Sequence, residues 1–106
     1  MIDATRPGAR SQRFHIELKL CASGMNVETF DALFDPVADA LYDMAEIIDP
    51  DLTSDSADLV LTFSMGVESV YEYDAVTAAM AAPRAAVIRA GASASFTSSD
   101  LRVRSA

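Results

Sequence analysis

Two stretches in which apolar and polar residues alternate restrict the possible fold more than any other feature of the sequence. In residues 13–22 the apolar members of the alternation are Phe14, Ile16, Leu18 and Leu20. Residues 58–67 alternate in the same way, although Val60 makes the second face fairly apolar as well. A period of two places alternate side chains on opposite faces of a β-strand. We therefore predict two strands, with 58–67 in the interior of the sheet.

The segment between these strands has the spacing of an amphipathic helix. Asn26 is a suitable N-cap residue. Apolar residues then recur at steps of three and four, at Phe30, Leu33, Phe34, Val37, Leu41 and Met44. Pro36 lies inside this pattern, where it would either kink the helix or, with Asp35 as a cap, begin a new one. Both alternatives keep the same apolar face.

Residues 46–58 allow more than one interpretation. Ile47 and Ile48 are a short apolar pair that fits either the tail of the helix or a short edge strand. The stretch 49–58 is polar and is interpreted as a loop or a hairpin, because aspartate, serine and threonine are common in turns.

A second helix is predicted after the strand at 58–67, and its start is ambiguous. Ser69 followed by Glu72 matches the capping-box pattern. Alternatively, the strand continues to Tyr73 and Asp74 caps the helix.

The end of the chain contains helix-breaking residues and one more alternating segment. Pro83 interrupts the alanine-rich helix, and Gly91 is a plausible C-cap. A serine-rich loop is expected at 93–99. Leu101 and Val103 then alternate with arginines, which predicts a short last strand.

The predicted order is strand, helix, one or two strands, helix, strand. It resembles the ferredoxin-like βαββαβ plan, in which two helices cover one face of an antiparallel sheet. The resemblance covers about residues 13–104 and implies an α+β fold, but it carries no functional residue. Residues 1–12 are expected to form a flexible basic arm and residues 13–106 a single α+β domain.

Charge is strongly segregated along the sequence. No lysine or arginine lies between Lys19 and Arg84, whereas thirteen acidic residues do, in a chain of net charge −8. Charge asymmetry bears on partners and solubility rather than on fold. It argues against nucleic acid or an anionic membrane as the partner of the central region. It favours a basic partner, a cation or a role in solubility alone.

Four aspartates recur every four residues within the first predicted helix. They are Asp31, Asp35, Asp39 and Asp43. This spacing places them along one side of a helix, where adjacent like charges destabilise an isolated helix by about 0.2–0.5 kcal/mol per pair. A solvated outer face is the simplest interpretation. A docking surface for a basic protein and mimicry of nucleic-acid phosphates are the alternatives, and we take these four residues as the candidate partner surface.

Metal and aromatic sites have weaker support in the sequence. Oxygen-bearing residues from Asp49 to Asp55 are similar to a calcium loop, but Ser54 replaces its glycine and Val60 its final glutamate. Tyr71 and Tyr73 could stack on a ligand together with Phe63. Because acidic residues flank the tyrosines, all three are interpreted as core and interface aromatics.

Catalysis has no recognisable signature in the sequence. His15 and Cys21 are the only histidine and cysteine. They share a strand face, but their separation of about 20 Å along the strand is too long for a catalytic pair. No phosphate-binding loop, nucleophile elbow or zinc-protease motif is present. We therefore expect no catalytic residue, no metal and no cofactor.

The sequence as a whole predicts a small non-catalytic interaction or regulatory module. We expect it to bind a protein partner and to form a homodimer through its sheet, because the face that carries Val60 needs a cover. A single cysteine and no apolar run of membrane-spanning length favour the cytoplasm. The alternatives are a small-molecule sensor with its ligand at a dimer interface, an enzyme that shares carboxylates across a dimer, and an inhibitor from a phage or GC-rich bacterium whose acidic face blocks a basic host protein.

Overall fold

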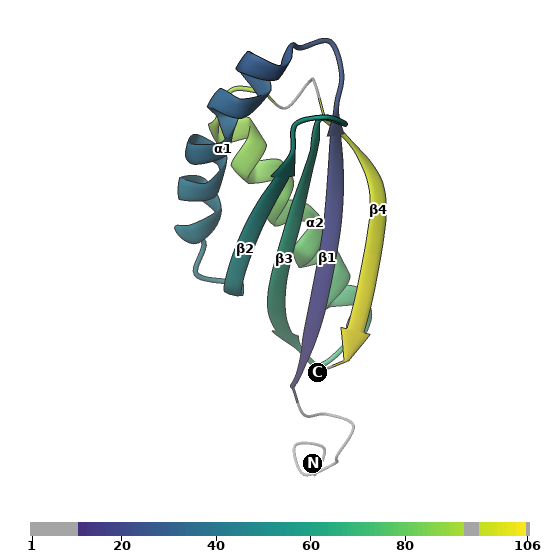
Figure 1. Ribbon diagram of the computed structural model, residues 1–106. Coiled ribbons are helices and arrows are strands. Elements are labelled where there is room, and N and C mark those ends of the chain that lie inside the picture. The colour runs from purple at the N-terminus through teal and green to yellow at the C-terminus, as the bar shows by residue number, and fades with distance from the viewer. Residues whose placement is uncertain (1–10, 93–95, 106) are drawn as a thin grey trace, which may run out of the picture.

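The computed structural model describes residues 11–92 and 96–105 and shows a ferredoxin-like α+β fold, as predicted. Its elements are β1 (Gln12–Ala22), α1 (Val27–Tyr42), β2 (Ile48–Asp55), β3 (Val60–Ser69), α2 (Glu72–Arg89) and β4 (Phe96–Ser105). The strands form one antiparallel sheet in the order β2-β3-β1-β4. Both helices lie on the same face of it (Figure 1). Most of the predicted basic arm, residues 1–10, lies outside the described residues.

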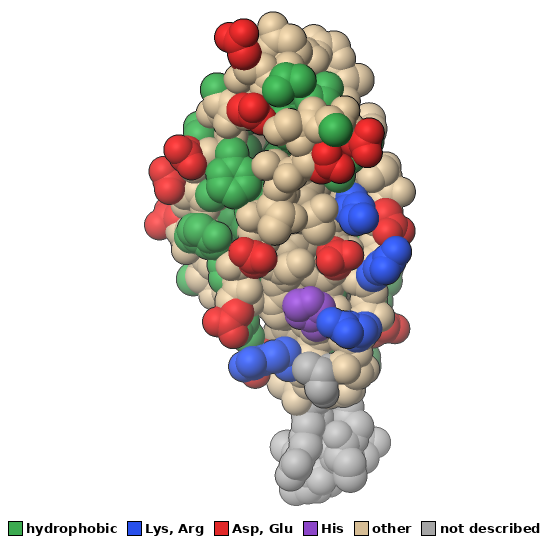
Figure 2. Space-filling model, viewed as in Figure 1, with side chains coloured by type: hydrophobic (Ala, Val, Ile, Leu, Met, Phe, Trp, Pro, Cys, Tyr) green, Lys and Arg blue, Asp and Glu red, His purple; other side chains and the backbone are tan. Residues whose placement is uncertain are grey.

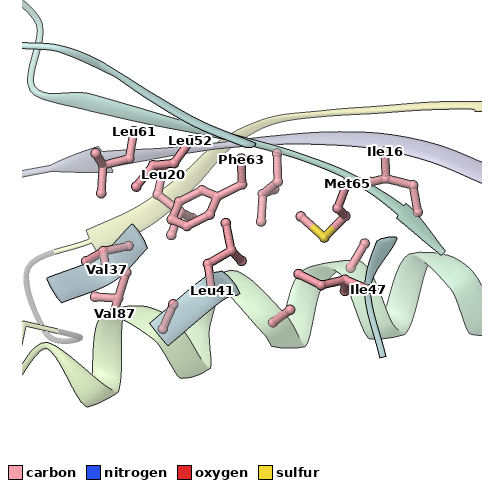
Figure 3. Close-up of a cluster of buried hydrophobic side chains, with 14 of the residues drawn as sticks. Ile16, Leu20, Val37, Leu41, Ile47, Leu52, Leu61, Phe63, Met65 and Val87 are labelled. Carbon is pink, nitrogen blue, oxygen red and sulfur yellow. The ribbon is translucent and has the colours of Figure 1, made fainter. Parts of the chain in front are cut away.

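The core lies between the helices and the inner faces of β1 and β3. The inward side chains of these two strands are almost fully buried: Phe14, Ile16, Leu18, Leu20, Leu61, Phe63, Met65 and Val67. They meet Val37 and Leu41 of α1 and Val87 of α2 (Figure 3). The rest of the buried face of α2 is mainly alanine, at Ala75, Ala79, Ala82 and Ala86. Small side chains let this helix approach the sheet closely.

Both helices continue through the prolines that the sequence left ambiguous. α1 begins after Asn26, whose side-chain oxygen accepts a hydrogen bond of 2.8 Å from the backbone N–H of Thr29, as predicted. Pro36 is exposed within α1, whereas Pro83 is buried within α2. Neither proline ends its helix.

The two predicted starts of α2 are both wrong. β3 ends at Ser69, and α2 begins at Glu72 after Tyr71, whose side chain makes no capping bond. The Ser69 hydroxyl accepts a hydrogen bond of 3.3 Å from the N–H of Tyr71, so it orders the connection instead of capping the helix.

Gly91 lies one residue beyond the C-cap residue Ala90, with φ of +83°. The N–H of Gly91 bonds Ile88 O at 2.9 Å, and the N–H of Ala92 bonds Val87 O at 3.1 Å. This is the Schellman arrangement, which a glycine at positive φ favours.

The polar stretch from Asp49 to Asp55 is mostly strand and not loop. β2 starts at Ile48 and pairs with β3, although the register shifts between Ile48 and Asp51, where Asp49 has a φ of +47°. Of the two alternatives for Ile48, the strand is therefore correct, and the turn is confined to residues 56–59. The segment is extended, so successive side chains point to opposite faces. They cannot converge on one ion as a calcium loop requires.

β4 is longer than the sequence indicated. The serine-rich stretch was interpreted as a loop up to residue 99, but the strand already begins at Phe96, and only 93–95 lie outside the described residues. Phe96 is buried, with its ring centroid 6.5 Å from that of Phe30 in α1. The register with β1 shifts between Lys19, opposite Asp100, and Leu20, opposite Ser98.

Because the alanine side of α2 packs against the sheet, we expect enlargement of a buried and of an exposed alanine in this helix to have different effects on stability. Ala79 is fully buried, whereas Ala81 is exposed. Ala79→Leu should lower the free energy of unfolding by about 1–3 kcal/mol, because extra methylenes overpack the seam between helix and sheet. Ala81→Leu is the matched control and should change it by less than about 0.5 kcal/mol. Urea denaturation followed by circular dichroism measures both free energies. Equal losses of stability in the two variants would contradict close packing between α2 and the sheet at Ala79.

Candidate functional site

The four aspartates of α1 form one continuous exposed surface, which we call the acidic stripe. Its residues are Asp31, Asp35, Asp39 and Asp43, and all four are exposed. The buried residues of α1, such as Phe30, Val37 and Leu41, lie on the opposite side of the helix. Four-residue steps rotate the stripe by about 40° each around the helix, so it crosses the outward-facing surface diagonally.

The two ends of the stripe contact different neighbouring elements. Asp31 Oδ1 accepts a hydrogen bond of 2.6 Å from Ser56 Oγ in the turn between β2 and β3. Asp43 Oδ2 lies 3.6 Å from Arg89 Nη1 of α2, in an ion pair whose side chains are largely exposed. Exposed pairs of this kind contribute little to stability. These contacts show that the stripe runs from the edge of the sheet to the second helix.

The central pair, Asp35 and Asp39, has no such contact. No hydrogen bond or ion pair joins either carboxylate to another side chain within residues 11–92 and 96–105. The last turn of α1 contains no basic residue, although the helix macrodipole there favours cations. The negative charges at Asp39 and Asp43 therefore lie where the helix itself disfavours them. This unfavourable interaction with the helix macrodipole adds to the repulsion between adjacent aspartates.

Apolar surface borders the stripe on its sheet side. Tyr42 follows Asp35 by seven residues, so the two share one side of α1, and 54% of Tyr42 is exposed. Val27 precedes Asp31 by four residues and is 48% exposed. In Figure 2, acidic and hydrophobic side chains lie next to one another along the left margin, where Figure 1 places α1. Exposed aromatic side chains such as Tyr42 are enriched at protein interfaces, whereas carboxylates are more common at their polar rim.

The open face of the sheet is polar and carries mixed charge. His15, Glu17, Lys19 and Cys21 alternate with the buried residues of β1 and so point away from the helices. Basic side chains gather over the β1–β4 half of this face (Figure 2). A hollow of about 310 Å³ there is lined by His15, Glu17, Arg102 and Arg104. Its lining combines two arginines and the histidine with one acidic residue, Glu17, so the hollow is not of a single charge.

Other sequence candidates are separated or displaced in the structure. His15 and Cys21 share the open face at opposite ends of β1, in agreement with the distance that excluded a catalytic pair. Of the three aromatics interpreted as core and interface residues, Phe63 belongs to the core, whereas Tyr71 and Tyr73 are strongly exposed. An interface role for the two tyrosines stays a prediction. In the described part of the chain, no three histidine, cysteine or acidic side chains come together to hold a metal ion.

The sequence missed a groove between the helices. It has a volume of about 290 Å³ and lies between the C-terminal end of α1 and α2, next to the Asp43–Arg89 pair. Ala78, Ala81, Ala82 and Ala85 line its α2 side. Four alanines on one side of a helix are visible in the sequence, but only packing shows which of them border a groove.

Comparisons with known proteins give no information about this site. No family model, curated protein or solved structure matches this chain. No helix among the described residues combines the length and apolar character needed to cross a bilayer.

The charge arrangement of α1 predicts that neutralising the central pair stabilises the protein. Asp35→Asn with Asp39→Asn removes every adjacent like-charge pair of the stripe and relieves the unfavourable charge near the helix C-terminus. The free energy of unfolding should rise by about 0.5–1 kcal/mol. Urea denaturation at low salt measures this gain, and added salt should diminish it.

The matched control is Asp51→Asn with Asp58→Asn. Both residues are exposed and lie outside α1, and their carboxylates make no hydrogen bond or ion pair with a described residue. Each double variant changes the net charge by the same amount. An equal gain in the control would mean that overall charge, and not the stripe, sets the effect.

Proposed function

We propose that this protein is a non-catalytic binding module whose acidic stripe recognises a basic surface on a partner protein. The observation that carries the proposal is the central pair: Asp35 and Asp39 are exposed and unpaired among the described residues, in a helix that their charges destabilise. A surface kept only for solubility could place its charges where the helix tolerates them. Residues that lower stability without a structural contact are typical of functional sites.

The dimensions of the stripe define the kind of partner that fits. Asp43 follows Asp31 by twelve positions, which corresponds to about 18 Å along the helix axis. Lysines or arginines spaced every four residues on a partner helix would meet the carboxylates one by one. Complementary charge of this kind raises association rates and discriminates against other partners. The exposed ring of Tyr42 supplies apolar contact, from which interfaces gain much of their affinity.

The proposal can be tested by capture from a bacterial lysate with three forms of the immobilised protein. They are the wild type, the Asp35→Asn/Asp39→Asn variant and the matched Asp51→Asn/Asp58→Asn control. We expect a basic protein to be retained by the wild type and the control and to be lost from the stripe variant. Its dissociation constant should then be measured with purified components, and it should weaken at least tenfold for the stripe variant only, an effect of about 1.4 kcal/mol.

Stability and binding should change in opposite directions in the stripe variant. The variant is expected to be more stable than the wild type, so weaker binding could not be attributed to unfolding. Binding should also weaken steeply as salt is added, because exposed charges are screened within about 8 Å at physiological ionic strength. Equal binding of the purified partner to all three forms would refute the proposal, as would binding that does not respond to salt.

A further inference from the structure

Among the described residues, no strand pairs with the outer edge of β4. This strand hydrogen-bonds only to β1 and ends the strand order on that side of the sheet. In Figure 1 it forms the right-hand margin of the molecule, whereas α1 lies beyond β2 on the other side. Exposed edges can template pairing with another strand, and proteins usually blunt them with charges, bulges or a covering segment. This edge is therefore open to a partner strand.

The side of β4 that faces the helix layer is incompletely covered. α2 packs mainly beneath β3 and β1. On β1, Ile16 and Leu18 are fully buried, but their register partners on β4, Val103 and Leu101, are not, and 37% of Leu101 is exposed. An apolar strip thus remains uncovered along this margin of the sheet.

α2 adds exposed apolar side chains beside the same margin. The hydrogen bond of 3.5 Å from Arg84 Nη2 to Ser98 Oγ identifies the side of α2 that faces β4. Met80 precedes Arg84 by four residues and Ile88 follows it by four, so all three share that side. Met80 is 39% exposed and Ile88 60%. Met80, Ile88 and Leu101 are therefore apolar side chains that the monomer leaves in contact with water along this margin, with Arg84 between Met80 and Ile88.

The charges of β4 are self-complementary about Leu101. Asp100 and Arg102 flank Leu101 and point to the open face, opposite Lys19 and Glu17 of β1. In the monomer the two form an exposed ion pair of 3.2 Å with each other, a kind of contact that contributes little to stability and can be exchanged for pairs with a second copy. If a second copy of β4 runs antiparallel to the first with Leu101 on a two-fold axis, Arg102 lies opposite Asp100 of the second copy, and Asp100 lies opposite Arg102. Across the four central strands, Glu17 and Arg102 of the first copy would be followed by Asp100 and Lys19 of the second copy. Negative and positive charges would then alternate from one strand to the next.

We propose that two copies of this chain pair through β4 in that register and form a continuous eight-stranded antiparallel sheet. Leu101 of each copy would meet its equivalent beneath the sheet, between the two α2 helices, where Met80 and Ile88 gain cover. The register is specific, because moving the axis by one residue places Asp100 opposite Asp100 or Arg102 opposite Arg102. Like charges directly opposite each other destabilise a sheet.

The irregularity of β4 limits how much of the edge can pair. The register with β1 shifts next to Ser99, which interrupts the regular alternation before Asp100. The backbone ladder between the copies is therefore centred on residues 100–102, and most of the remaining contact comes from the apolar side chains of α2 and β4. The dimer would hold the two acidic stripes at opposite ends of one sheet, so a partner with two basic sites would bind with avidity.

Charge-reversal variants test both the edge and the register. Asp100→Arg leaves an arginine at both 100 and 102, and Arg102→Asp leaves an aspartate at both. Each variant alone turns both attractive cross-copy pairs into repulsive ones and should weaken the dimer at least about tenfold. An equimolar mixture of the two variants restores opposite charges at every cross-copy pair, so it should form a heterodimer. Sedimentation velocity over about a hundredfold range of concentration measures each case, because dimerisation follows mass action.

Each possible result either supports or overturns the proposed dimer. Concentration-dependent dimerisation of the wild type, loss in each single variant and recovery in the mixture would support it. A wild type that stays monomeric throughout, a dimer unaffected by either substitution, or a mixture that fails to associate would overturn it. The Asp35→Asn/Asp39→Asn variant should dimerise like the wild type, because α1 lies away from β4. Failure of the dimer is therefore distinguishable from failure of partner binding at the stripe.

Discussion

The arrangement of the whole molecule depends on the burial of the inner faces of β1 and β3 against the two helices. These are the two interior strands, and their inward side chains are almost completely removed from water. Because α2 presents mostly alanine to them, it lies close beneath β1 and β3. The position of α2 beneath these two strands also leaves β4 with little cover from this helix. The buried centre of the sheet and its open apolar margin thus have one physical cause.

Because of this topology, the segregation of charge along the sequence becomes a separation of charge across the sheet. The stretch between Lys19 and Arg84, which has thirteen acidic residues and no lysine or arginine, contributes α1, β2, β3 and the first part of α2. The lysine and arginines of the sheet lie in β1 and β4. β2 and β3 together carry four acidic residues and no basic one. β1 and β4 carry four basic residues against two acidic ones. Because the strand order places β2 and β4 at opposite edges, the negative and the more positive surfaces separate across the sheet. Each edge can then address a different partner.

The acidic stripe shows which features of a site a local sequence pattern can predict and which it cannot. A four-residue spacing in an amphipathic segment is enough to place four aspartates on the outer side of a helix, and all four are exposed. The pattern could not show that Ser56 and Arg89 contact the ends of the stripe, because both contacts join different elements. It also could not show that the central pair lacks partners among the described residues, which is the observation that favours a binding role.

What the sequence determined by itself was local: the alternation of β1 and β3, the Asn26 cap, the apolar side of α1 and the helix end at Gly91. Each depends on residues within a few positions of one another, where steric and hydrogen-bonding preferences act directly. Tertiary structure decided the rest. The polar segment from Asp49 to Asp55 has low intrinsic strand preference, and it becomes a strand through its pairing with β3. The exposure of Leu101 likewise depends on where α2 packs, and so on contacts between residues far apart in the chain.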